Sequence, residues 1–347
     1  MANNRTVRKY RRQVEPDGTS PLALGAMGIA AAALGAATAW IVYSNTMIDH
    51  AVFLPNAIPA DRRAFRGRRA GNLSYYVDES GEGRPLVLIH SVNAAASAYE
   101  MGPLFDYYRG KRPVYALDLP GFGFSDRPDR EYTPQLYADA IADFLETQVG
   151  EAADVVALSL GSEFACRAAL MLPERFNSLA LISPTGLGRN KEQTGSQQAG
   201  QSGASRVLYP LFSFSLWGRP FYDLLTTRRS IRYFLEKSFI GPVPPEMVAY
   251  DSLTAHQPGA VHAPLHFITG KLFTPNARRQ LYEQVATRTL VIYDRDNFTS
   301  FEMLPELLAN NLRWAAVRIV PTLGLPHWEQ LLKTVETLNN FWDGNIS

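Results

Sequence analysis

Short apolar runs alternate with segments of helical periodicity through most of the chain. The run at residues 72–78 alternates between apolar and polar side chains, as a half-buried strand does. Six further runs are apolar almost throughout, which is typical of strands covered on both faces; they lie at residues 85–90, 112–120, 154–160, 178–183, 289–293 and 317–320. Helical spacing predicts helices at 133–150, capped by Thr133 before Pro134, and at 328–342. Alternating strands and helices predict the α/β class, with a parallel sheet and crossover helices.

One long segment, residues 187–285, breaks the alternation because it contains no apolar run of the strand type. It begins with a polar loop rich in Gly, Ser and Gln at 195–205 and continues with aromatic-rich stretches suited to short helices. Long insertions at one strand end usually carry function rather than folding stability. We therefore predict a core at residues 65–186 and 286–347, with a helical lid between its two parts.

The N-terminal region differs from the rest in composition. A basic tail at residues 1–20 precedes an uncharged run at 21–43, and about 20 apolar residues suffice to cross a bilayer. We therefore predict a transmembrane helix at 21–43, a linker at 44–64, and a single-pass membrane protein with a cytoplasmic N-terminus. Arginines at 62–69 leave the side of the catalytic domain open. The alternatives are a cleaved signal peptide ending near Ala39 and a buried helix of the following domain.

Charge and cysteine content narrow the possible partners. Lys and Arg total 34 and Asp and Glu 33, so the net charge of +1 offers no general reason to expect nucleic acid. The single cysteine, Cys166, excludes an internal disulfide, and we interpret it as a small buried apolar residue. His256, His262 and His266 are too loosely spaced for a zinc pattern, and no glycine loop suited to phosphate is present. We expect neither a metal nor a cofactor.

The strongest chemical signal is a serine in a tight turn between a predicted strand and a predicted helix. The turn reads Ala157-Leu-Ser-Leu-Gly161, and its small outer residues let strand and helix approach closely while Ser159 stays exposed. The N–H groups at the start of the helix favour developing negative charge. We predict that Ser159 is a nucleophile; the alternative is an ordinary turn serine.

Three further motifs follow the strand ends in a fixed order. They are His90-Ser91-Val92-Asn93, the turn Asp118-Leu-Pro-Gly-Phe-Gly-Phe-Ser125, and Pro326-His-Trp-Glu329. Together with the serine turn they resemble the α/β-hydrolase superfamily over about residues 66–342. The resemblance implies an α/β-hydrolase fold, in which a mostly parallel central sheet carries helices on both faces and a helical lid insertion. It also implies an oxyanion hole formed by the backbone N–H groups of Val92 and Leu160, with Ser91 at the position of the glycine in the family's His-Gly loop.

The same resemblance implies an acid and a base for the serine. The family places its acid a few residues beyond a late strand, which indicates Asp296, with Asp294 as the alternative. The family normally reads Gly-His-x-Pro-His before its last helix, with the first His catalytic, but here that position is either Gly324 or deleted. His327 is then the candidate base. The alternative is that His327 only supports the start of the helix and the triad is incomplete.

These residues predict a serine hydrolase that cleaves an ester-like or related acyl substrate without a cofactor. A small-molecule, apolar substrate is indicated by aromatic residues in the lid, namely Tyr209, Phe212, Phe214, Trp217, Phe221, Tyr222, Tyr233 and Phe234. Two alternatives remain open. One is a non-catalytic α/β-hydrolase-fold protein that binds a hydrophobic ligand at the membrane, and the other is an acyltransferase that uses the same residues.

Overall fold

The computed structural model describes residues 21–189, 209, 214 and 216–346, with side chains of the first helix from residue 32 onward. The predicted basic tail at 1–20, the polar loop at 195–205 and Phe212 lie outside these residues. The chain divides into two compact units, residues 1–47 and 48–347. Each unit is described by itself below.

The first unit contains one helix, α1 (Pro21–Met47), among its described residues. Across the part of the chain that the structure describes, no helix combines the length and the apolar character needed to span a bilayer. This finding contradicts the predicted transmembrane helix at 21–43 and the single-pass membrane localisation inferred from it. The run is rich in alanine, which has the highest helix propensity but carries little apolar surface, so its lack of charge predicts a helix better than it predicts a membrane span.

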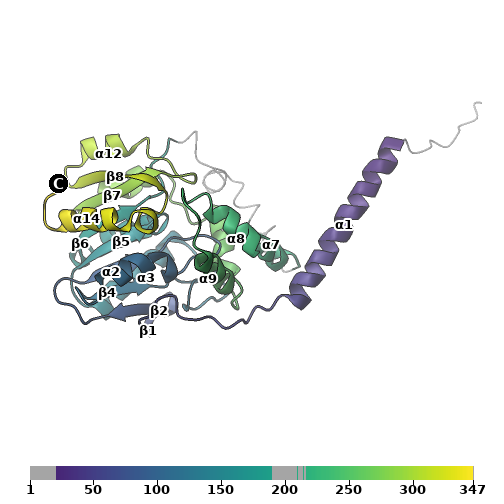
Figure 1. Cartoon of the computed structure of the whole chain (residues 1–347), viewed down its shortest axis with the longest axis horizontal. Helices are drawn as coiled ribbons and strands as arrows, with labels where there is room; N and C mark the ends of the chain where they lie inside the picture. The colour runs from purple at the N-terminus through teal and green to yellow at the C-terminus, as the bar shows by residue number, and fades with distance from the viewer. Residues whose placement is uncertain (1–20, 190–208, 210–213, 215, 347) are drawn as a thin grey trace, which may run out of the picture. The chain divides into compact units, whose positions relative to one another are not determined.

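The second unit is built on a mostly parallel sheet, as the sequence predicts. Its described strands are β1 (Asp61–Gly67), β2 (Gly71–Asp78), β3 (Leu86–Ile89), β4 (Val114–Leu117), β5 (Ala153–Leu158), β6 (Phe176–Ile182), β7 (Thr289–Arg295) and β8 (Trp314–Leu323). They are ordered β1-β2-β4-β3-β5-β6-β7-β8 (Figure 1). The pairs β1–β2 and β2–β4 are antiparallel, and the strands from β4 to β8 run parallel. The predicted fold class is confirmed.

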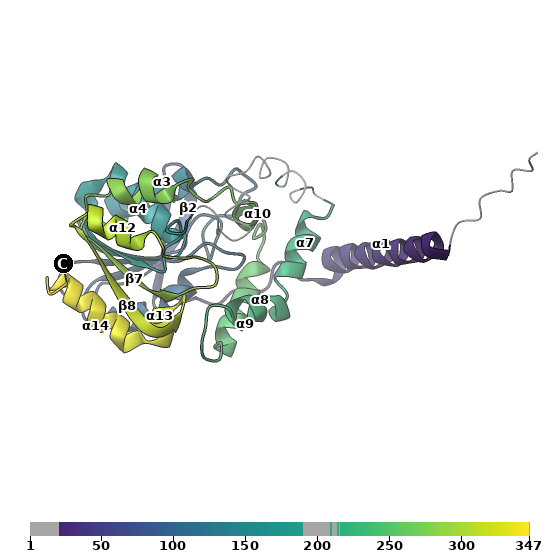
Figure 2. The same cartoon turned by 90° about the horizontal axis from the view of Figure 1, so that it is seen from above.

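Helices cover both faces of the sheet (Figure 2). One face carries α3 (Pro134–Phe144), α4 (Gly161–Met171) and α12 (Leu304–Asn310). The other carries α13 (Pro326–Glu329), α14 (Leu331–Trp342) and α2 (Gly102–Tyr108), whose buried residues share one core cluster with those of α14. Successive side chains of a strand point to opposite faces. Val87 of β3 accordingly lies in the core beneath α3 and α4, whereas Leu88 lies in the core beneath α2 and α14. The near-continuous apolar runs reflect this burial on both sides.

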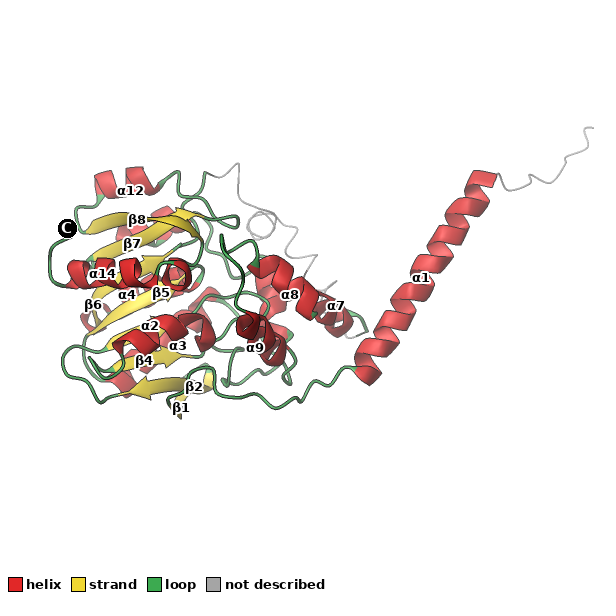
Figure 3. Ribbon diagram, viewed as in Figure 1, coloured by secondary structure: helices red, strands yellow, loops and turns green. Residues whose placement is uncertain are grey.

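The described lid helices lie between β6 and β7 in the chain. They are α7 (Gly218–Leu225), α8 (Arg228–Leu235), α9 (Pro245–Ala255), α10 (His262–Ile268) and α11 (Ala277–Gln280). Figure 3 shows α7, α8 and α9 beyond the carboxyl ends of the parallel strands, where ligands bind in open α/β sheets. The lid is therefore placed over the end of the sheet at which the predicted catalytic residues lie.

Residues 54–58, which precede β1, pack within the second unit. Leu54 and Ile58 are buried in the core beneath α2 and α14. The N–H of Ala57 donates to Tyr76 Oη over 2.8 Å, and Tyr250 Oη on α9 donates to the carbonyl oxygen of Pro55 over 3.1 Å. Part of the region predicted as a linker at 44–64 is thus held against both the sheet and a lid helix.

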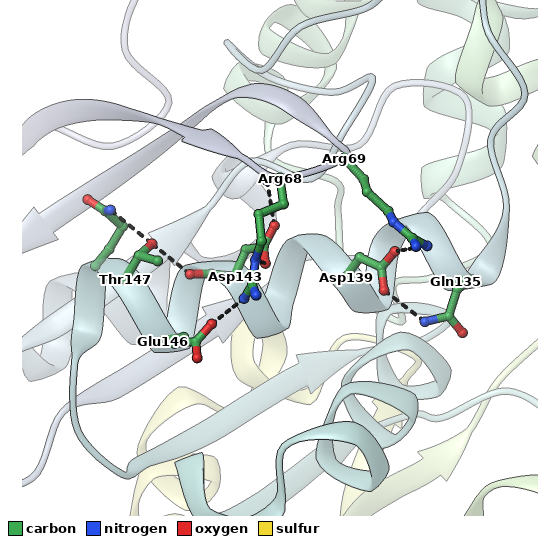
Figure 4. A network of polar contacts seen from close by, with 8 residues as sticks. Arg68, Arg69, Gln135, Asp139, Asp143, Glu146 and Thr147 are labelled. Atoms are coloured by element: carbon green, nitrogen blue, oxygen red, sulfur yellow. Dashed lines mark hydrogen bonds and ion pairs between the residues drawn. The ribbon is translucent and has the colours of Figure 1, made fainter.

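Strand β1 is an element that the sequence pattern does not predict. It reads DRRAFRG and forms the edge of the sheet, where exposed charged side chains are normal and apolar periodicity is weak. After β1, the side chain of Arg68 donates hydrogen bonds to Asp143 in α3 and to Glu146 just beyond it. Arg69 donates to Asp139, also in α3 (Figure 4). The buried Asp143 also accepts the backbone N–H of Arg68 over 2.7 Å, which fixes the first hairpin on α3.

Candidate active site

Ser159 lies at the turn between β5 and α4, as predicted. Its φ angle is +50°, a left-handed conformation that is strained for a residue with a side chain. Its N–H donates to the carbonyl oxygen of Ile182 on β6 over 2.8 Å, and its own carbonyl accepts from Ser162 over 3.1 Å. A Cβ added to Gly161 would overlap the carbonyl oxygen of His90, so the turn requires glycine there. The serine is thus held in a strained position by neighbours on both sides.

The two predicted oxyanion donors lie in the loops beside this turn. Val92 follows β3 and is buried, and Leu160 directly follows Ser159 at the start of α4. Among the described residues, neither backbone N–H donates to an acceptor. Buried N–H groups are normally paired, so two unpaired ones near a strained serine are suited to receive a developing negative charge.

His90 braces the loop that contains Val92. Its Nε2 accepts the backbone N–H of Leu119 over 2.9 Å, and its Nδ1 donates to the carbonyl oxygen of Ser91 over 2.5 Å. Burial lowers the pKa of His90 to about 4, so the ring is neutral at pH 7, as this pattern of one acceptor and one donor requires. Both ring nitrogens are occupied, which leaves His90 a structural role.

Asp296 follows β7 and lies against Gly324. Its Oδ1 accepts the N–H groups of Phe298 over 2.7 Å and Thr299 over 3.3 Å. A Cβ placed on Gly324, whose φ is +91°, would lie 3.2 Å from Oδ2 of Asp296. Burial raises the pKa of Asp296 to about 6. The structure therefore brings the predicted acid to the position at which the family has its histidine.

Asp294, the alternative acid, has both oxygens engaged. Oδ1 accepts from Arg318 Nε over 2.8 Å, and Oδ2 accepts the backbone N–H of Thr322 over 2.9 Å. The side chain is buried and joins β7 to β8. These contacts favour Asp296 as the residue that faces the candidate site.

His327 lies in α13 and makes its hydrogen bond elsewhere. Its ring is fully buried, and Nε2 donates to the backbone carbonyl oxygen of Glu100 over 2.9 Å. Nδ1 has no partner among the described residues, and burial lowers the pKa of His327 to about 4. No hydrogen bond joins His327 to Ser159 or to Asp296. The structure does not bring these three residues into one hydrogen-bonded triad, so His327 as the base stays a prediction.

Sequence reasoning missed Glu100, which lies in the short 3₁₀ helix Ala98–Met101 between β3 and α2. Its carboxylate accepts hydrogen bonds from Ser91 and Asn93, the residues on either side of Val92. A single glutamate eleven residues after the end of β3 is not part of any motif that the sequence shows. Only its contacts identify it.

The lid aromatics that predict an apolar substrate differ in how far they are buried. Tyr222 is buried and its Oη donates to the carbonyl oxygen of Ala94 over 2.7 Å, beside the loop that contains Val92. Tyr233 and Phe234 on α8 are 53% and 44% exposed, and Phe214 is 50% exposed. The apolar pocket stays a prediction.

Within the described residues no group of three His, Cys, Asp or Glu side chains could hold a metal ion.

The sequence matches the alpha/beta hydrolase family over residues 86–336, which is more than half of the chain. The chain belongs to this family. The match covers the sheet from β3 onward together with the Ser159 turn, Asp296 and the Gly324 loop.

Curated relatives match over shorter segments. A 2-hydroxymuconate semialdehyde hydrolase of Pseudomonas sp. (strain CF600) is 32% identical over 120 residues, which are 34% of this chain and 42% of that protein. An esterase of Mycobacterium tuberculosis is 39% identical over 89 residues, which are 25% of this chain and 30% of that protein. The chain thus matches less than half the length of either relative.

Solved structures resemble the chain over more of its length. The crystal structure of a membrane phospholipase A, a bacterial virulence factor, has a TM-score of 0.65 and 20% identity. The alignment covers 93% of this chain and 98% of that chain. At this identity the likeness establishes the fold alone, and it agrees with the α/β-hydrolase architecture described above.

Proposed function

We propose that this protein is a serine hydrolase that cleaves an ester-like or related acyl substrate with Ser159 as its nucleophile. The proposal rests on the strained, left-handed Ser159 between β5 and α4. In the adjoining loops, the backbone N–H groups of Val92 and Leu160 have no acceptor within the part of the chain that the structure describes. The curated relatives named above are a hydrolase and an esterase, which agrees with acyl chemistry.

The proposed reaction begins with attack of Ser159 Oγ on the acyl carbon. A carbon–oxygen bond forms, and the carbonyl electron pair moves onto the carbonyl oxygen, where the N–H groups of Val92 and Leu160 donate hydrogen bonds. In other enzymes, removing one such donor costs about 3–4 kcal/mol of transition-state stabilisation. The leaving group departs with a proton, and water then releases the acyl group from Ser159.

A base must take the proton of Ser159. We propose that Asp296 accepts this proton through an intervening group. Strand β6 separates β5 from β7, so Ser159 and Asp296 follow strands that are ~10 Å apart. That distance requires a bridge, because a base must lie within hydrogen-bond reach or act through a water. A water or a polar group of the substrate beside Gly324, where the family has a histidine ring, would form this bridge.

The direct test is labelling with a fluorophosphonate probe followed by peptide mapping. The purified protein should become phosphonylated on the peptide that contains Ser159, because the probe reacts with activated serines. Gly324 at the family's histidine position favours a second candidate, a non-catalytic protein that binds a hydrophobic ligand with this fold. An unlabelled protein, under conditions in which a control esterase reacts, would support that second candidate.

His327→Ala should keep probe labelling within about threefold of the wild-type rate, because His327 bonds Glu100 rather than Ser159. The variant should be destabilised by about 1–3 kcal/mol through the lost buried hydrogen bond and packing. Labelling kinetics and urea unfolding measure the two effects. A folded His327→Ala variant that no longer labels would establish His327 as the base and contradict the bridging proposal.

The activity should rise with pH through about 6, the pKa of Asp296, because only the ionised carboxylate can accept the proton. Below that pH, kcat/KM should fall about tenfold per pH unit, and Asp296→Asn should remove this dependence together with most of the activity.

The contribution of Asp296 to the free energy of unfolding should change with pH in the opposite direction. Between the usual pKa of 3.8 and about 6 the folded protein binds more protons than the unfolded chain, so this carboxyl's contribution declines as pH rises. An acid limb that persists in the Asp296→Asn variant would assign it to another group.

A further inference from the structure

The carboxylate of Glu100 joins the two residues that flank the oxyanion donor Val92. Oε2 accepts the backbone N–H of Ser91 over 2.8 Å. Oε1 accepts Ser91 Oγ over 2.9 Å and Asn93 Nδ2 over 2.7 Å. Asn93 Oδ1 in turn accepts the N–H of Ala95 over 2.7 Å. The Glu100 side chain therefore holds the backbone of Ser91 and the side chain of Asn93, which lie on either side of Val92.

This arrangement also explains a departure of the sequence from its family. Ser91 stands where the family has glycine in its His-Gly loop, and a serine hydroxyl beside a buried loop needs an acceptor. Glu100 provides that acceptor and also accepts the backbone N–H of the same residue. The Ser91 side chain thus becomes an additional anchor of the loop.

Donors surround the buried carboxyl group of Glu100. Burial raises the pKa of Glu100 above its usual value, and the donors from Ser91 and Asn93 offset part of that rise. Burial and the charge of Glu100 raise the pKa of Asp251, on the lid helix α9, well above its usual range. The backbone N–H of Ser91, Ser91 Oγ and Asn93 Nδ2 all donate to Glu100, so both of its carboxyl oxygens serve as acceptors. Hydrogen bonds to an ionised carboxylate are roughly twice as strong as neutral ones.

Glu100 also connects the loop to α13. Its backbone carbonyl oxygen accepts His327 Nε2 over 2.9 Å and Trp328 Nε1 over 2.8 Å. The ring of Tyr99 stacks between the rings of Trp328 and Tyr250, with centroids 5.8 and 4.8 Å away. The segment that carries Glu100 is thus held on two sides, and its carboxylate offers the Val92 loop a rigid support.

We propose that Glu100 is a positioning residue that orients the backbone N–H of Val92 toward the oxyanion of the transition state. The inference rests on the proposed function, because it concerns the oxyanion hole of the same site. Glu100 does not touch the substrate in this proposal and acts only through Ser91 and Asn93. Its contribution is therefore specific to the transition state, in which the negative charge on oxygen develops.

Glu100→Gln tests the proposal, because an amide has about the same shape but places an N–H₂ group against donors of Ser91 or Asn93. With p-nitrophenyl butyrate as the substrate, kcat should fall at least ~10-fold while KM stays within about twofold, as expected when a transition-state contact is weakened. The matched control is Glu163→Gln. Glu163 is also buried and accepts from Thr185 and the N–H of Thr274, but it does not contact the Val92 loop. Its kcat should change less than about threefold.

A second measurement separates this inference from the proposed function. Amide hydrogen exchange of residues 90–97 should be faster in Glu100→Gln than in wild type and unchanged in Glu163→Gln, and it requires no turnover. Equal exchange of this loop in all three proteins would overturn the inference even if the protein is an active hydrolase. An equal loss of kcat in both variants would overturn the inference as well. So would an unchanged kcat in Glu100→Gln with a raised KM. A wild-type protein without activity but with the expected exchange would count against the proposed function alone.

Discussion

Ser159→Ala should abolish fluorophosphonate labelling and reduce acyl hydrolysis by at least about a thousandfold. Removing the nucleophile from comparable serine enzymes reduces kcat by roughly 10⁶-fold, and the oxyanion hole alone retains only a small residual rate. Alanine should keep the fold, because it adopts the left-handed conformation with no more strain than serine does. Labelling, turnover of p-nitrophenyl butyrate and thermal unfolding measure the three properties.

Ser183 provides a matched control within the same sheet. It follows the neighbouring strand β6, has φ +45°, and has a buried hydroxyl without a partner among the described residues. Ser183→Ala removes a buried unsatisfied hydroxyl, so it should keep labelling and leave stability unchanged or slightly higher. Equal labelling of wild type and Ser159→Ala would exclude Ser159 as the nucleophile. Loss of labelling in Ser183→Ala instead would transfer that role to the second strained serine.

Gly161→Val should destabilise the protein by more than about 3 kcal/mol and remove labelling. Any Cβ at this position overlaps the carbonyl oxygen of His90, which belongs to the backbone and cannot move without displacing the Val92 loop. A branched side chain adds further overlap with Ile89, whose Cγ2 already lies 3.3 Å from the added Cβ. Urea unfolding and labelling of the soluble fraction measure both effects.

Gly102→Ala is the control for this substitution. Gly102 begins α2, has a right-handed helical φ of −49°, and has no atom within 4 Å of an added Cβ. Alanine there should be neutral or stabilise by up to about 1 kcal/mol, because it reduces the entropy of the unfolded chain. A Gly161→Val variant as stable as Gly102→Ala would show that the turn and the loop can separate, contrary to the close approach described above.

Local patterns predict most of the second unit. The run at 85–90 becomes β3, and the helix capped by Thr133 begins at Pro134, with Thr133 Oγ1 accepting the N–H of Leu136 over 3.1 Å. These features depend on side-chain periodicity and on capping within a few residues, so the sequence alone determines them. The same holds for the Ser159 turn, because small residues at fixed spacing are needed wherever a strand passes directly into a helix.

Local patterns were insufficient in two places. Strand β1 was missed because an exposed edge strand keeps its charged residues and its pairing partner supplies most of its stability. The uncharged run at 21–43 predicts a membrane span by its length and lack of charge, but an alanine-rich run also favours a helix through its intrinsic propensity. In both cases one local pattern was compatible with two environments.

Only the tertiary structure decided which residues meet at the site. Asp296 lies against Gly324. Glu100 contacts Ser91 and Asn93 through its carboxylate, and its backbone carbonyl accepts a hydrogen bond from His327, which lies 227 residues further along the chain. Such contacts arise when distant segments pack against one another, and no local periodicity encodes them. The sequence by itself determined the family, the sheet and the serine turn, because these depend on short-range spacing. The partners of the acid, of His327 and of the Val92 loop depend on packing across the whole domain.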